Sequence, residues 1–161
     1  MTEFAGRSAR VVFLDASNRL FLVRSASRRG QPDARVTPGG GVEDGEDLAS
    51  AAARELQEET GLAVNAQDLH LVAFTTGTAE LGWASGLFRD DFFACRVVSH
   101  DVDTAGMTDF ERGQYAGHHW WTLAELAATS GTIYLNDLAD LVADLIAGRA
   151  PEMPVALPWH H

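Results

Sequence analysis

Runs of β-branched, aromatic and other apolar residues, separated by polar stretches, predict several β-strands along the chain. Residues 8–14 and 20–24 are rich in β-branched and aromatic side chains and flank a polar turn, so they predict two neighbouring strands or a hairpin. Residues 69–76 and 87–98 have the same character and predict two more strands. Between this second pair, we expect a glycine-rich loop over residues 77–86.

Two segments carry apolar residues at the spacing of an amphipathic helix. In the first, apolar side chains recur every three or four residues from Leu48 to Leu56, and Gly61 follows as a common helix stop. In the second, residues 136–148, aliphatic side chains form one stripe and most acidic residues lie off it. The second helix is therefore predicted to pack on the core and to carry no site.

The later part of the chain combines aromatic residues with turn-forming ones. This part includes the pair Trp120 and Trp121, and we expect Trp121 in the core. His118 and His119 are interpreted as strand-edge residues, with pH-sensitive contacts as the alternative. Prolines punctuate residues 150–159, so that tail should run over the surface.

The length of 161 residues predicts a single domain that spans residues 1–161. No apolar run approaches the ~20 residues that a membrane helix needs, and the first ten residues lack an apolar signal core. The single cysteine, Cys95, excludes an intramolecular disulfide and lies in an apolar run, where a small core residue is expected. These features favour a cytoplasmic protein with no membrane contact.

The formal net charge of −11 changes what the protein can bind. It disfavours duplex nucleic acid, which requires a basic surface, and it disfavours an acidic membrane. A polyanionic substrate can still bind where metal ions reverse the local field. The charge balance therefore points towards metal-dependent recognition of an anion.

The first predicted helix gathers three glutamates beside its apolar stripe. Glu55, Glu58 and Glu59 lie at positions i, i+3 and i+4, where like charges repel one another. A divalent cation among them would remove that repulsion, since hard cations prefer carboxylate oxygens. The alternative interpretation is a solvated charged face.

The same stretch resembles a known family motif, the Nudix box. The box has a glycine, a glutamate six positions later, and then the pattern Arg-Glu-apolar-x-Glu-Glu-x-Gly-apolar after a seven-residue spacer. This chain fills the fixed positions with Gly40, Glu46, Arg54, Glu55, Leu56, Glu58, Glu59, Gly61 and Leu62. The flanking pairs Pro38-Gly39 and Val42-Glu43 are also similar to the family. A motif of this length is far more specific than a lone glycine pattern.

The resemblance implies an α/β fold, the Nudix fold, in which an α/β/α sandwich holds a mixed β-sheet between helices. It also implies hydrolysis of a pyrophosphate bond, dependent on Mg²⁺ or Mn²⁺, in a nucleoside diphosphate linked to another moiety. Nucleoside triphosphates, nucleotide sugars and dinucleotides all fit that description. A non-catalytic Nudix-type nucleotide-sensing domain and a purely structural module are the alternatives, and a homodimer remains open.

Residue roles follow from the resemblance. Glu55, Glu58 and Glu59 would hold the metal with the carbonyl of Gly39. Arg54 would orient a glutamate by a bidentate contact. Glu46 and Gly40 would help to position the ligands without binding the metal.

The resemblance also implies a strand that ends in Trp120-Trp121, a short helix after it, and an extra glutamate from the loop before that strand. Glu111 is the first candidate and Asp109 the second. The general base is either a glutamate of the box or Glu111.

Substrate choice should depend on loops, because the box contacts only the shared diphosphate. Arg28 and Arg29 are candidate phosphate contacts, with solvated side chains as the alternative. Trp83 is a candidate for stacking on a base, with cover of the core edge as the alternative. A third loop is expected over residues 108–117. Many relatives carry Trp at the position of Arg35, so base stacking there is not inherited.

Overall fold

The computed structural model describes residues 4–26, 34–80, 85–128, 132–133 and 138–158. Its elements, in chain order, are β1 (Gly6–Leu14), β2 (Leu20–Ser25), β3 (Ala34–Val36), β4 (Gly39–Gly41), α1 (Leu48–Thr60), the 3₁₀ helix η1 (Ala66–Asp68), β5 (His70–Glu80), β6 (Ser85–Arg96), α2 (Asp109–Gln114), β7 (Tyr115–Trp121), α3 (Leu123–Ala128), β8 (Thr132–Ile133), α4 (Leu138–Ile146) and β9 (Val155–Ala156).

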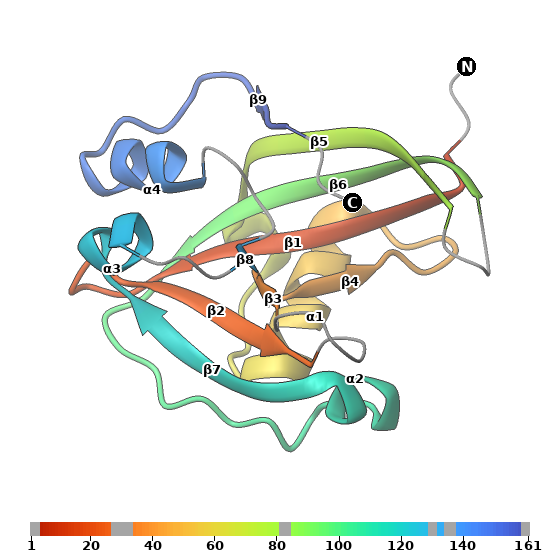
Figure 1. The fold of residues 1–161 in the computed structure, drawn as a ribbon, viewed down its shortest axis with the longest axis horizontal. Coiled ribbons are helices and arrows are strands. Elements are labelled where there is room, and N and C mark those ends of the chain that lie inside the picture. Colours follow the sequence, from red (N-terminus) through yellow and green to blue (C-terminus); the bar gives the residue numbers. More distant parts are fainter. Residues whose placement is uncertain (1–3, 27–33, 81–84, 129–131, 134–137, 159–161) are drawn as a thin grey trace.

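A mixed sheet forms the centre of the molecule (Figure 1). Its main path runs β8-β3-β2-β1-β6-β5-β9, while β4 pairs with β1 and β7 pairs with β2. Strand β1 runs parallel to β6 and antiparallel to β2, which it joins through the register pair Leu14↔Leu20. The predicted strand pair at the start of the chain is therefore confirmed.

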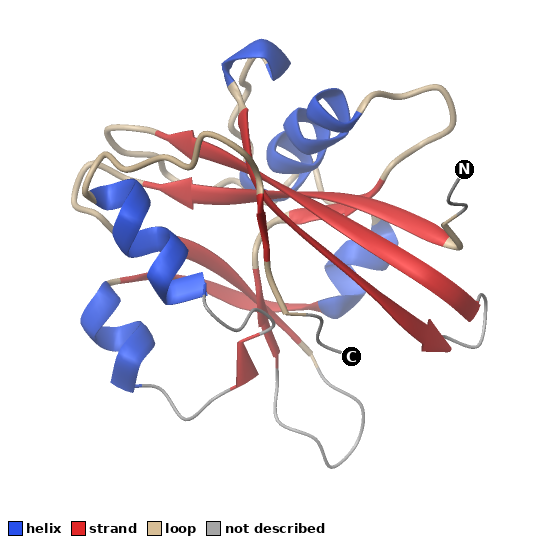
Figure 2. Cartoon of the chain, turned by 90° about the horizontal axis from the view of Figure 1, so that it is seen from above, coloured by secondary structure: helices blue, strands red, loops and turns tan. Residues whose placement is uncertain are grey.

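Helices cover both faces of this sheet (Figure 2). On one face, Val11 and Phe13 of β1 pack with Leu56 of α1. On the other face, Val12 and Leu14 pack with apolar side chains of α3 and α4. Successive residues of a strand point to opposite faces, so the continuous apolar run of β1 serves two cores at once. The predicted α/β/α sandwich with a mixed sheet is confirmed.

Capping groups fix both ends of α1. Asp47 is the N-cap, and its Oδ1 accepts a hydrogen bond of 2.8 Å from the backbone N–H of Ser50. Gly61 is the C-cap and has a φ of 78°, a left-handed conformation that glycine adopts without strain. The predicted stop at Gly61 is confirmed, and the last turns of α1 are held where the glutamates lie.

The predicted loop at residues 77–86 is wrong in most of its length. Residues 77–80 extend β5 and residues 85–86 extend β6, and the register continues from Gly77↔Phe88 to Glu80↔Ser85. Cross-strand pairing over a long hairpin outweighs the weak strand propensity of glycine here. Trp83 lies outside the described residues.

Several smaller predictions can be compared with the structure. Trp121 packs against the core on the α3 side, as expected. Cys95 is buried, and burial raises the pKa of its thiol to about 11, which agrees with a core residue. The tail over residues 150–159 was predicted to run over the surface, but part of it joins the sheet, because β9 pairs with β5 and Leu157 is buried. None of the described helices is long and apolar enough to cross a membrane. The single-domain assignment stays a prediction.

Replacing the N-cap of α1 should weaken the fold without changing the core. Asp47→Ala removes the acceptor for the Ser50 N–H and should lower the free energy of unfolding by about 1 kcal/mol, as measured by urea denaturation. Asp44→Ala is the matched control, because Asp44 is an exposed acidic residue before the same helix. Equal losses in the two variants would show that the cap does not hold α1.

Candidate active site

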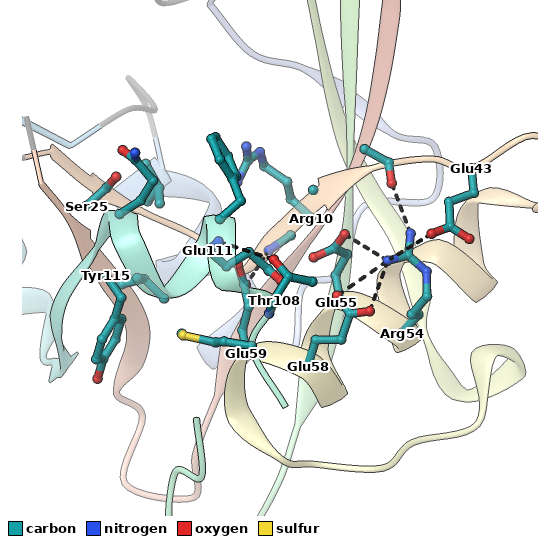
Figure 3. Close-up of a pocket in the computed structure, with 18 residues that line it drawn as sticks. Arg10, Ser25, Glu43, Arg54, Glu55, Glu58, Glu59, Thr108, Glu111 and Tyr115 are labelled. Atoms are coloured by element: carbon teal, nitrogen blue, oxygen red, sulfur yellow. Dashed lines mark hydrogen bonds and ion pairs between the residues drawn. The ribbon is translucent and has the colours of Figure 1, made fainter. Parts of the chain in front are cut away.

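Segments from several parts of the chain line one pocket of about 490 Å³ (Figure 3). Strand β4 supplies its glycines, α1 supplies Arg54 and the three glutamates, and α2 supplies Phe110 and Glu111. Five of the nine fixed residues of the box thus line one cavity together with a segment some fifty positions later in the chain: Gly40, Arg54, Glu55, Glu58 and Glu59.

Glycines are required at β4 because other atoms approach its backbone closely. A Cβ at Gly40 would lie 2.6 Å from Oε1 of Glu55, and a Cβ at Gly39 would lie 2.4 Å from the carbonyl oxygen of Ala9. Gly39 also has a φ of 154°, and its N–H donates a hydrogen bond of 2.8 Å to Oε2 of Glu59. The glycines therefore bring the β4 backbone against two carboxylates of α1.

Glu55, Glu59 and Glu111 form a cluster in which the ligand oxygens all lie within 4.8 Å of one another. Glu55 is only 6% exposed. Its Oε2 is buried and has no hydrogen-bond partner among the described residues. An unsatisfied buried carboxylate oxygen is costly and needs an explanation.

The protonation of these carboxylates reflects their burial. The pKa of Glu55 is raised from 4.5 to about 7 by burial and by the nearby charges of Glu111 and Glu58. The pKa of Glu59 is raised to about 8, chiefly by burial, although the Gly39 N–H and the charge of Arg10 act in the opposite direction. Each shift means that the folded protein disfavours the negative charge at that position.

The residues present fit a divalent cation. Three carboxylates converge, one oxygen lacks a partner, and oxygen ligands are those that Mg²⁺ and similar ions prefer. A cation would also favour the charged forms that burial disfavours. Glu58 lines the same pocket beside Arg54, so its predicted place among the ligands stays a prediction, as does that of the Gly39 carbonyl.

Arg54 connects the glycine strand, Glu46 and the carboxylate cluster. It makes a bidentate contact with Glu46, from Nε at 2.9 Å and from Nη2 at 3.0 Å. Its Nη1 donates to Oε1 of Glu55 at 3.0 Å, and its Nη2 donates to the carbonyl of Gly41 at 3.0 Å. The hydrogen bond from Arg54 lowers the pKa of Glu46, so this pair stays charged. The predicted bidentate contact thus falls on Glu46, and a single contact orients Glu55.

The expected loop at residues 108–117 is wrong, because the segment forms α2 and the start of β7. Thr108 and Glu111 form a capping box, in which the Glu111 N–H donates to Oγ1 of Thr108 at 3.2 Å and the Thr108 N–H donates to Oε1 of Glu111 at 3.0 Å. The sequence Thr-Asp-Phe-Glu carries this signal and could have predicted the helix. Of the two candidates, Glu111 rather than Asp109 has its carboxylate in the described cluster.

Arg10 and Phe110 are among the pocket residues that sequence reasoning missed. Arg10 lines the pocket from β1 and donates from Nη1 to the Thr37 carbonyl at 3.0 Å. Phe110 lines the pocket from α2 although it is 78% exposed. The available signals were the charge of Arg10 inside an apolar strand and the aromatic ring of Phe110 in a polar segment. Arg28 and Arg29 lie outside the described residues, as does Trp83, so their substrate contacts stay predictions.

Comparison with known proteins places this chain in a family. The NUDIX domain profile matches residues 5–140. The chain belongs to the Nudix family. It is 28% identical over 147 residues to an RNA pyrophosphohydrolase of Teredinibacter turnerae. The aligned region covers 83% of this chain and 82% of that protein.

Solved structures agree with this assignment at the level of the fold. A NUDIX hydrolase from Nitrosomonas europaea has a TM-score of 0.66 and 21% identity, with 90% of each chain covered. An Ap4A hydrolase from C. elegans, solved as a binary complex, has a TM-score of 0.58 and 16% identity, with 89% of this chain and 96% of that chain covered. The Nudix fold predicted from the box is therefore shared by known members of the family.

The raised pKa values predict how the cation-free protein responds to pH. Because the folded state binds protons at Glu55 and Glu59 more tightly than the unfolded state, the stability that these two groups contribute should be full below about pH 4.5 and be lost as the pH rises through about 7 and 8. Glu55→Gln should raise the free energy of unfolding by about 1–3 kcal/mol at pH 8 and change it little at pH 5, measured by urea denaturation in EDTA.

Glu152→Gln serves as the control for this pH dependence, because Glu152 is exposed and lies in the C-terminal tail. Its effect should be small at both pH values. The same gain for Glu55→Gln at pH 5 and at pH 8 would contradict the raised pKa of Glu55.

Proposed function

We propose that this Nudix chain hydrolyses a pyrophosphate bond in a nucleoside diphosphate linked to another moiety, with Mg²⁺ or Mn²⁺ held by Glu55, Glu59 and Glu111. The observation that carries the proposal is the buried, unsatisfied Oε2 of Glu55 inside a three-carboxylate cluster that opens into the pocket. A bound divalent cation supplies neutralisation of the phosphate oxygens and acidification of a water molecule. Every other part of the site positions groups for that chemistry.

The residues of the chain hold the carboxylates in place before any substrate arrives. Arg54 fixes one oxygen of Glu55, the Gly39 N–H fixes one oxygen of Glu59, and the capping box fixes one oxygen of Glu111. Each carboxylate thereby keeps its second oxygen available. Preorganised charges of this kind make up most of what hydrolysis of a phosphoric anhydride requires from a protein.

The residue that accepts a proton from water needs a carboxylate oxygen that is not already held by strong hydrogen bonds. Glu58 lines the pocket and contacts Nη1 of Arg54 only at 3.4–3.5 Å. We assign to Glu58 the role of accepting the proton of the attacking water as its oxygen bonds to phosphorus and the bridging P–O bond breaks. Glu111 remains the alternative base.

The pocket and the family both support this substrate class. The RNA pyrophosphohydrolase and the Ap4A hydrolase that resemble this chain are both named for phosphoric anhydride substrates that carry nucleosides. The net charge of −11 favours a small nucleotide derivative over a long RNA, which gains affinity from basic contacts along its backbone. Phe110, exposed at the pocket, is available to stack on the base.

Removing one charge from the cluster should abolish turnover and leave the fold intact. Glu59→Gln should lower kcat by about 10³-fold or more, because an amide is a poor ligand for a hard cation. The assay uses a panel of nucleoside triphosphates, nucleotide sugars and dinucleoside polyphosphates with Mg²⁺ or Mn²⁺, and chromatography detects the two phosphorylated products of each hydrolysis. Circular dichroism reports folding.

The same panel separates hydrolysis from nucleotide sensing. Wild-type protein that binds these nucleotides without forming hydrolysis products would refute the enzyme and favour the non-catalytic alternative. Turnover of Glu59→Gln at the wild-type rate would remove Glu59 from the proposed centre.

Truncating Phe110 should affect substrate binding and not the chemical step. Phe110→Ala should raise KM about 10- to 100-fold and leave kcat within a factor of about three, since stacking on a base contributes ~1–3 kcal/mol. Met153→Ala is the matched control, because Met153 is 77% exposed in the C-terminal tail. A KM for Phe110→Ala equal to that of the wild type would show that the base binds elsewhere.

A further inference from the structure

Arg10 is a charged residue of the pocket that the steps proposed above do not use. It lies on β1 between the buried residues Ala9 and Val11, and it lines the pocket beside the carboxylate cluster (Figure 3). It is the direct register partner of Gly39 in the pairing of β1 with β4. A Cβ at Gly39 would lie 2.6 Å from Cγ of Arg10, so the aliphatic chain of the arginine packs against that glycine. Arg10 is thus fixed next to the backbone N–H that binds Glu59.

The guanidinium group of Arg10 is held in place by a neutral partner. Its Nη1 donates to the carbonyl oxygen of Thr37 at 3.0 Å. A guanidinium group has several N–H donors, and this bond uses one of them. Among the described residues, Arg10 forms no ion pair, although its charge acts at longer range and lowers the pKa of Glu59 against the larger effect of burial. Its positive charge therefore faces the pocket without a carboxylate in direct contact.

The second arginine of the described lining has its donors occupied. Arg54 donates to Glu46, to Glu55 and to the Gly41 carbonyl. Across the lining that the structure describes, these two arginines meet five glutamates: Glu43, Glu55, Glu58, Glu59 and Glu111. Of the two, Arg10 is the one with N–H donors left for a further anion.

Charge balance in this pocket bears on which substrates it accepts. The proposed cation offsets part of the glutamate charge and serves the diphosphate that is cleaved. A third phosphate brings more negative charge, which the remaining glutamates repel at short range in a partly buried site. A guanidinium group nearby changes this repulsion into attraction, because its planar group donates two parallel hydrogen bonds to phosphate.

We propose that Arg10 binds a substrate phosphate outside the pair that is cleaved. It thereby selects nucleoside triphosphates, and dinucleoside polyphosphates with three or more phosphates, over nucleotide sugars. A nucleotide sugar has only the two phosphates of the cleaved bond, so it offers Arg10 no third phosphate. This inference rests on the proposed hydrolysis and narrows its substrate class.

Kinetics on three substrates test this selection. Arg10→Gln should lower kcat/KM at least about tenfold for ATP and for diadenosine tetraphosphate, because a charged hydrogen bond is lost. The loss for ADP-ribose should stay below about threefold, because this substrate has no third phosphate. Equal losses on all three substrates, no loss on any of them, or a wild-type preference for ADP-ribose over ATP would overturn the inference.

Two further variants control for structural effects. Arg10→Lys keeps the charge and the aliphatic chain that packs on Gly39 but lacks the planar group, so it should show a smaller loss with the same order of substrates. Arg149→Gln, on an exposed arginine paired with Asp144, should match the wild type. Circular dichroism and melting temperature report folding of each variant.

Binding without turnover separates this inference from the proposed reaction. The analogues α,β-methylene-ATP and α,β-methylene-ADP resist cleavage at the methylene bridge and differ by one phosphate, and both are titrated with Mg²⁺ by isothermal calorimetry. Wild-type protein should bind the ATP analogue at least about tenfold more tightly, and Arg10→Gln should lose most of that difference. An unchanged difference in Arg10→Gln would overturn the role of Arg10. A difference that depends on Arg10, in a protein that hydrolyses none of the substrates, would refute the hydrolysis and leave the phosphate contact standing.

Discussion

The burial of one carboxylate, that of Glu55, is the constraint on which the rest of the site depends. An ionised carboxylate in a protein interior is stable only when it is paired and hydrogen-bonded. Here Arg54 satisfies one oxygen, and the absence of a side chain at Gly40 leaves room for the group. Oε2 of Glu55 has no hydrogen-bond partner among the described residues. The proposed cation would bind this oxygen and balance its negative charge. Glu46 and the β4 backbone then serve to hold Arg54.

Small residues determine how closely this carboxylate approaches the sheet. Ala51 and Ala52 of α1 are fully buried against the face that carries Val11 and Phe13. Short side chains at these positions let the helix axis lie near β1 and β4, and larger ones would move the helix outward because interiors are closely packed. The position of Glu55 therefore depends on alanines that do not line the pocket.

What the sequence could predict follows from how local each signal is. The apolar run of β1, the helix stop at Gly61 and the spacing of Glu55, Glu58 and Glu59 are local, and the structure has these elements where they were expected. The capping signal of α2 was also local but was overlooked. The approach of Glu111 to Glu55 is different, because it depends on how a segment over fifty residues away folds back. The pairing of Arg10 with Gly39 likewise needs a strand register that no local pattern determines.

The capping box of α2 gives Glu111 two tasks that share one carboxylate. Its Oε1 closes the helix start at Thr108, and the same carboxylate belongs to the cluster proposed to hold a cation. Fraying of this six-residue helix would then remove one ligand, so occupancy of the centre and order of α2 are thermodynamically linked. Gly113 within α2 weakens the helix by about 1 kcal/mol relative to alanine. Surface substitutions in α2 during evolution can thus change the affinity for the proposed cation while the residues of the box stay the same.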